Sequence, residues 1–275
     1  MVRTTEYLSA LLLCFLLSSV GCVSVVPDLP HTPLPPQNSK DFSSSLIVTP
    51  ADPEVDPMSK WFSRVTQDGI DPFPSVCSLH DSDGRLIGSG VLIRSNVVLT
   101  AGHCIDNEIS SVKFIDDEEI AVKKVVLYPH YSETLGWNAQ IMDDIGMVFL
   151  EYDYDCATPA VIGDIKTVGR YHPITSVGYS FGYKKYSKRG TFRYFGTLIE
   201  QPKKMTFLPD PVSIWFGDSG GGVFANIRGE MCLVGIISSF TKSHTGAIME
   251  CTATITSEYS YWIDLEIDKN EEEME

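Results

Sequence analysis

The chain has 275 residues, of which 43% are hydrophobic, and its 21 basic and 36 acidic residues give a formal net charge of −15. This acidic balance argues against binding to DNA, RNA or an anionic lipid surface through bulk electrostatics. The full length is near the upper size of one compact domain, and about 200 residues remain once an export segment and a linker are set aside. The apolar fraction is enough for a large core.

Residues 1–22 have the pattern of an export signal. Arg3 provides a weakly positive start, residues 11–17 form an apolar run too short to span a bilayer, and small residues follow. Cys22 directly follows Gly21, which resembles a bacterial lipoprotein box in which the cysteine is acylated; ordinary signal-peptidase cleavage is the alternative. The sequence predicts a protein that is secreted, or anchored at the cell surface through Cys22.

Residues 23–60 form a segment rich in proline, serine and aspartate. Such a composition buries too little apolar surface to offset the entropy lost on ordering, and the prolines favour an extended chain. We interpret this segment as a linker or pro-segment that precedes a folded domain over residues 61–275.

Strand and turn signals alternate from Pro72 to Leu150. We expect a strand over residues 75–80, a tight turn over 81–84 and a returning hairpin over 86–99. The acidic run over 116–119 is expected at a hairpin tip, where a solvated turn is favoured over a calcium site. These signals indicate antiparallel β-structure.

Three stretches supply the groups that activate a serine, since its hydroxyl needs a histidine to take its proton and a carboxylate to orient that histidine. Residues 99–104 end an apolar strand in His103, residues 143–150 place an acidic pair before a buried strand, and residues 217–222 surround Ser219 with glycines. Each stretch alone has a structural alternative, namely a satisfied histidine, a solvated turn and a flexible glycine loop. Together they indicate acyl transfer.

These stretches resemble the motifs of the trypsin-like (chymotrypsin-fold) serine endopeptidases, which read T-A-x-H-C, D-I-x-L and G-D-S-G-G in that chain order. The resemblance implies that His103 is the general base, Asp144 the orienting carboxylate and Ser219 the nucleophile. Asp144 is chosen over Asp143 because it directly precedes the isoleucine of the motif. The N–H groups of Gly217 and Ser219 are implied to hold the oxyanion. The order His, Asp, Ser argues against the folds of subtilisins and α/β-hydrolases.

The resemblance runs from about Pro72 to about Ile267. It implies an all-β fold of two antiparallel six-stranded β-barrels with a short C-terminal helix that starts near Ser260. The implied reaction is hydrolysis of protein or peptide substrates through an acyl-enzyme, without a cofactor or metal. A non-catalytic surface binding protein on the same fold is the alternative, and the intact triad argues against it because binding alone does not need those three residues.

Three positions are implied to form the pocket for the P1 residue, which precedes the scissile bond. Ser213 lies six residues before the implied nucleophile, where cleavage after Lys or Arg would need an aspartate; Phe240 and Cys251 are the other two positions. We therefore expect an uncharged P1 residue. Lys242 and His244 lie close enough in sequence to keep an acidic preference open.

Asp218 is implied to take part in activation. In processed family members this aspartate pairs with a new N-terminal ammonium that cleavage releases. The bond between Arg64 and Val65 is the candidate cleavage site, although the sequence that follows departs from the usual I-V-G-G start. The sequence thus predicts a zymogen that is processed at Val65.

Five cysteines remain once Cys14 and Cys22 are set aside, so at least one is unpaired within the chain. In the family, the cysteine after the catalytic histidine usually bridges to one near the position of Gly88, and that partner is missing here. Cys77 is a substitute partner for Cys104, and this pairing stays open.

Overall fold

The structure is a computed structural model. It describes residues 63–64, 71–115, 118–134, 140–180, 185–195, 203–209, 214–242 and 248–273. The predicted export segment with Cys22, the proline-rich segment, Val65, Ser213 and His244 lie outside these ranges. The chain divides into two units, residues 1–46 and 47–275, and all described residues belong to the second.

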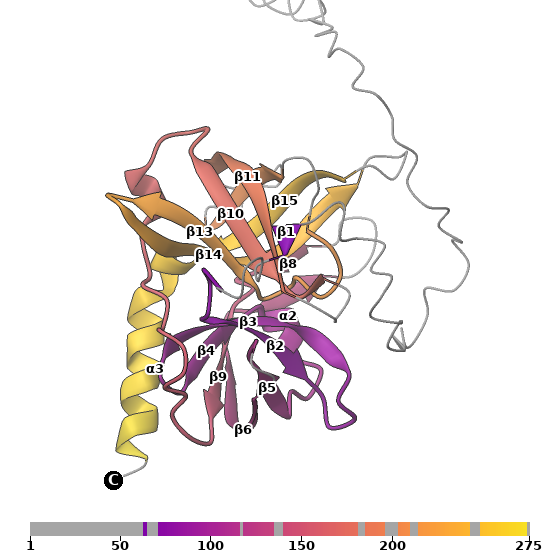
Figure 1. The fold of residues 1–275 in the computed structure, drawn as a ribbon, viewed down its shortest axis with the longest axis vertical. Coiled ribbons are helices and arrows are strands. Elements are labelled where there is room, and N and C mark those ends of the chain that lie inside the picture. The colour runs from indigo at the N-terminus through magenta and orange to yellow at the C-terminus, as the bar shows by residue number, and fades with distance from the viewer. Residues whose placement is uncertain are drawn as a thin grey trace, which may run out of the picture. The chain divides into compact units, whose positions relative to one another are not determined.

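A closed six-stranded antiparallel barrel forms the first part of this unit, with the strand order β2-β3-β4-β9-β6-β5 (Figure 1). Apolar side chains from its strands pack into one buried core. The predicted turn before β3 is present, because Gly84 adopts φ +75° and donates its N–H to the Asp81 carbonyl at 3.0 Å. The strands are β2 (Val76–His80), β3 (Leu86–Arg94), β4 (Val97–Thr100), β5 (Ser111–Lys113), β6 (Glu119–Leu127) and β9 (Gly146–Leu150).

A seven-stranded antiparallel sheet follows, with the order β1-β11-β10-β13-β14-β15-β12 and an additional pairing between β11 and β12. It has its own apolar core, centred on Phe192, Phe207 and Ile237. The prediction of a mostly β fold with a closed six-stranded barrel is confirmed. The strands are β1 (Ser63–Arg64), β10 (Pro173–Gly178), β11 (Tyr186–Phe195), β12 (Lys204–Pro209), β13 (Gly222–Ile227), β14 (Glu230–Lys242) and β15 (Ile248–Ile255).

Short elements lie in the connections between these strands and before the C-terminal helix. They are the helix α2 (Gly102–Ile105), the two-stranded hairpin β7 (Ser132–Thr134) and β8 (Gln140–Met142), and the 3-10 turns η2 (Ile165–Thr167) and η4 (Thr256–Tyr259).

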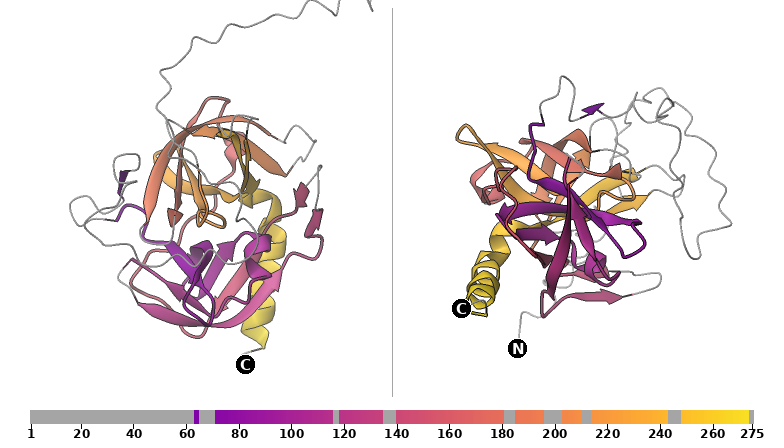
Figure 2. Two further views of the ribbon diagram at one scale, coloured as in Figure 1. Left: turned by 90° about the vertical axis from the view of Figure 1, so that its right-hand side faces the viewer. Right: turned by 60° about the horizontal axis from the view of Figure 1, so that its bottom comes forward.

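The C-terminal helix α3 (Ser260–Glu272) begins at the predicted residue and lies beside the barrel in Figure 1 and Figure 2. Trp262, Ile263 and Ile267 bury one side of the helix in the core that includes the barrel interior. At its end, Glu273 accepts a hydrogen bond from the Lys124 ammonium at 2.8 Å. In the described part of the chain, no helix has the length and apolar character needed to cross a membrane.

Candidate active site

His103 and Asp144 are brought together by the pairing of β4 with β9. Leu99 lies opposite Met147 in this pair, so the end of β4 and the start of β9 meet. The Nδ1 atom of His103 lies 3.1 and 3.0 Å from the two carboxylate oxygens of Asp144, and its backbone N–H donates to Oδ1 at 3.0 Å. Asp144 is fully buried, whereas the His103 side chain is 23% exposed. The imidazole is therefore held by a buried carboxylate while part of it stays accessible.

The electrostatics of this pair determine the tautomer of the histidine. Burial alone would raise the pKa of Asp144, but the hydrogen bonds and charges around it outweigh burial and lower this pKa. Burial would lower the pKa of His103, but the hydrogen bonds to Asp144 and Cys104, together with the charges nearby, outweigh burial and raise it. An ionised carboxylate only accepts hydrogen bonds, so Nδ1 carries the proton. The Nε2 atom is then the basic nitrogen of the neutral ring.

The loop that carries Ser219 is fixed against β3 and the end of β4. Ser89 on β3 donates its N–H to the Ser219 carbonyl and its hydroxyl to the Gly217 carbonyl, both at 2.7 Å. A methyl group added at Gly88 would lie 2.8 Å from the Ser219 carbonyl oxygen and 2.9 Å from the Cys104 sulfur. Ser219 therefore lies beside the helix α2 that carries His103. Ser89 did not figure in the sequence prediction.

The backbone conformation and close contacts of Gly220 explain why this turn needs a glycine. Its φ is +82°, and an added Cβ would lie 2.1 Å from both the Ser89 carbonyl oxygen and the Thr100 hydroxyl. Positive φ and this close approach both exclude a side chain. Thr100 directly precedes the Ala-Gly-His segment, so Gly220 connects the serine loop to the histidine strand.

We expect Gly220→Ala to lower the free energy of unfolding by about 2–5 kcal/mol, because left-handed strain adds to a steric clash with a packed backbone. Gly84→Ala is the matched control: Gly84 has φ +75° but nothing within 4 Å of an added Cβ. That substitution should lower the free energy of unfolding by only about 1–2 kcal/mol, because only the left-handed backbone conformation disfavours alanine there. Urea titration of both variants measures the difference, and equal losses would contradict the packing described here.

A cavity of about 210 Å³ opens beside Ser219. The Trp215 and Phe240 rings are stacked at its wall, with centroids 6.3 Å apart and planes 7° apart. Phe240 lines this cavity, whereas Cys251, opposite Phe240 in the β14–β15 register, is fully buried in the second core and is not among the described lining residues. The described lining residues, none of them charged, are Ile214, Trp215, Phe216, Ser219, Ser238, Ser239 and Phe240.

Asp218 is buried next to Ser219 and is held by groups that the sequence prediction did not include. Its carboxylate accepts the Ser180 hydroxyl at 2.9 and 2.8 Å, and the Trp215 N–H at 2.7 Å. These bonds connect the serine loop to the segment after β10. Arg64, which precedes the candidate cleavage site, is paired with Tyr186 between β1 and β11.

None of the five cysteines of the described residues forms a disulfide bond, and Cys156 is the exposed one among them. The Cys77–Cys104 bond that the sequence left open is therefore not formed in the structure. Among the described residues there is also no cluster of three or more side chains suited to hold a metal ion.

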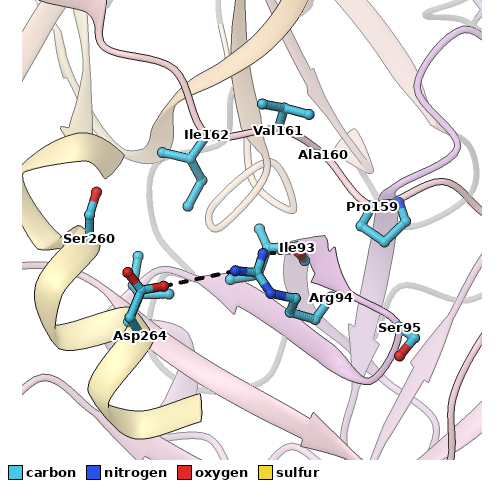
Figure 3. A pocket seen from close by; sticks show the side chains of 10 residues that line it. Ile93, Arg94, Ser95, Pro159, Ala160, Val161, Ile162, Ser260 and Asp264 are labelled. Atoms are coloured by element: carbon cyan, nitrogen blue, oxygen red, sulfur yellow. Dashed lines mark hydrogen bonds and ion pairs between the residues drawn. The ribbon is translucent and has the colours of Figure 1, made fainter. Parts of the chain in front are cut away.

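A second, larger cavity of about 500 Å³ lies between the end of β3, the segment before β10 and the helix α3 (Figure 3). Arg94 and Asp264 form an ion pair across it at 3.8 Å. It shares no lining residue with the cavity beside Ser219.

Comparison with known proteins identifies the family. The model of the trypsin-like peptidase domain matches residues 88–236, which include His103, Asp144 and Ser219. Mouse neuropsin, a serine protease expressed in the limbic system of the brain, has a similar fold: the TM-score is 0.58 at 18% identity, over 71% of this chain and 95% of the neuropsin chain. The chain belongs to the trypsin-like peptidase family and is a serine endopeptidase.

Proposed function

We propose that the chain hydrolyses peptide bonds through a triad of His103, Asp144 and Ser219. The observation that carries this proposal is the buried His103–Asp144 pair, which leaves Nε2 basic beside the loop of Ser219. A buried carboxylate that holds an accessible imidazole in one tautomer is the arrangement that general-base catalysis requires.

The proposed reaction begins when the Ser219 hydroxyl attacks the carbonyl carbon of the scissile bond and its proton passes to His103 Nε2. The N–H groups of Gly217 and Ser219 stabilise the oxyanion that forms. His103 then returns the proton to the leaving amine as the carbon–nitrogen bond breaks. A water molecule, deprotonated by His103, hydrolyses the acyl-enzyme and regenerates Ser219. The two Ser89 hydrogen bonds support this assignment because they hold the backbone of both oxyanion donors.

We infer that the cavity beside Ser219 receives the P1 side chain and prefers an uncharged one. Its described lining is aromatic, aliphatic and hydroxyl-bearing, and no acidic or basic group offsets the desolvation of a charge. Its volume of about 210 Å³ suits an apolar side chain of moderate size.

Digestion of a peptide library, with the cleaved bonds read by mass spectrometry, tests both the activity and this preference. We expect kcat/KM for apolar P1 residues to exceed that for Lys, Arg, Asp and Glu by at least about tenfold, because an unpaired charge in the cavity is costly. Phe240→Ala should allow cleavage after larger aromatic P1 residues as well. A preference for Lys, Arg, Asp or Glu would contradict the P1 assignment without affecting the triad.

The remaining parts of the proposal concern maturation and architecture. We propose that residues 1–22 direct export, that Cys22 is the lipidation site, and that cleavage after Arg64 lets the Val65 ammonium reach Asp218.

We also propose that the six strands of the second sheet other than β1 form the second six-stranded barrel. The β11–β12 pairing supports this, since β11 and β12 are the first and last of these six strands in the sheet order.

A further inference from the structure

A buried lysine, Lys204, is connected to the Asp144 carboxylate through the Ser238 hydroxyl. Lys204 is the first residue of β12, where it pairs with Thr254 of β15, and only 4% of it is exposed. Its ammonium donates a hydrogen bond to the Ser238 hydroxyl at 2.9 Å, and Ser238 donates to Oδ2 of Asp144. Lys204, Ser238, Asp144 and His103 thus form one continuous chain of hydrogen bonds.

The chemistry of this chain fixes the direction of each bond. An ammonium has only donors, so it must occupy a lone pair of the Ser238 oxygen, and the single hydroxyl hydrogen is then committed to Asp144. Asp144 receives this bond in addition to those from His103. Buried polar chains of this kind are strong because few water molecules compete with them.

The other ionisable groups around the pair are arranged so that Lys204 is the cation acting on Asp144. Lys203, the adjacent lysine, pairs at 3.0 Å with Asp143, which also accepts the Tyr259 hydroxyl at 2.6 Å. Tyr128 lies beneath the Lys203 ammonium, and the other titratable side chains beside the His103 segment are those of Tyr131 and Cys104. The pKa of Lys204 is lowered by burial, an effect that the charges of Asp144 and Asp143 partly offset.

We propose that Lys204 is a positioning residue that, acting through Ser238, sets the lower pH limit of catalysis. A positive charge beside Asp144 weakens the attraction of this carboxylate for an imidazolium, so it favours the neutral, basic form of His103. The enzyme then keeps its general base at a lower pH than a triad of the same geometry without this lysine. This inference rests on the proposed triad.

The test is the pH profile of kcat/KM for Lys204→Met and Lys204→Gln against the wild type. Loss of the ammonium should move the acid limb upward by about one pH unit, so that activity falls severalfold near pH 6 and much less above pH 8. Lys204→Arg, which keeps the charge, should show the same acid limb of kcat/KM as the wild type. Lys166→Met is the matched control, because Lys166 pairs with Glu258 at the surface and is 51% exposed.

The outcomes separate this inference from the proposed function. A wild type that cleaves no peptide at any pH, in any processed form including protein cleaved after Arg64, would refute the triad itself. An active wild type whose acid limb is unchanged in the neutral variants would overturn the role of Lys204 alone. A uniform loss of rate at every pH would assign Lys204 a purely structural role and would also overturn the inference. The glutamine variant replaces the ammonium with an uncharged polar group rather than an apolar one, so the test survives if the methionine variant fails to fold.

Discussion

Replacing Ser219 by alanine is expected to lower kcat/KM for peptide hydrolysis by about 10⁴- to 10⁶-fold. The hydroxyl oxygen is the only heavy atom removed, and the reaction then lacks its nucleophile. The backbone of the loop is held by Ser89 through carbonyl groups that alanine also has, so stability should change by less than about 0.5 kcal/mol. Initial rates on a peptide substrate, together with thermal unfolding, measure both quantities.

Ser95→Ala provides the control for this change. The Ser95 hydroxyl bonds to Asp153 at 2.9 Å on the surface, and Ser95 does not line the cavity beside Ser219. Its activity should stay within about twofold of the wild type. A Ser219→Ala protein that retains most of its activity would exclude Ser219 as the nucleophile.

The second large effect is expected for Asp144→Asn, which should lower kcat by about 10⁴-fold near neutral pH. An amide is similar in shape to a carboxylate, but its NH₂ group is a donor. It would therefore favour the His103 tautomer with the proton on Nε2, which cannot accept a proton from Ser219. Steady-state kinetics between pH 6 and pH 9 measure this loss.

Asp143→Asn is the matched control, since the two acidic residues are adjacent in the sequence. Asp143 pairs with Lys203 and has φ +47°, a conformation that asparagine also tolerates. Its kcat should change by less than about tenfold. If Asp143→Asn instead produced the larger loss, the assignment of the orienting carboxylate would be wrong.

The parts of the site that the sequence predicted are those carried by short, local patterns. His103 follows a strand, Asp144 precedes one and Ser219 lies in a glycine turn, so each is marked by a local pattern, and the three patterns together indicate the chemistry. The chain order of the three then gave the family. The first barrel and helix α3 followed from strand, turn and family signals of the same local kind.

The missed residues act through pairings between distant strands, and no local pattern marks them. Ser89 reaches the serine loop from 128 residues away in the chain, and Lys204 reaches Ser238 from 34 residues away. Ser180 holds Asp218 across 38 residues. The P1-pocket position of Cys251 was implied by the family resemblance alone, and the structure buries this residue in the second core, opposite Phe240 in the β14–β15 register.

Reaction with a fluorophosphonate, followed by intact mass spectrometry of the mature protein, tests the triad most directly. We expect one adduct per chain, located on Ser219 by peptide mapping and absent in His103→Ala. The mass before reaction would also report where the mature chain begins and whether Cys22 is acylated. If no adduct formed in any processed form, including protein cleaved after Arg64, or if it formed on another residue, the triad would be refuted, and the absence of any adduct would favour the non-catalytic binding alternative.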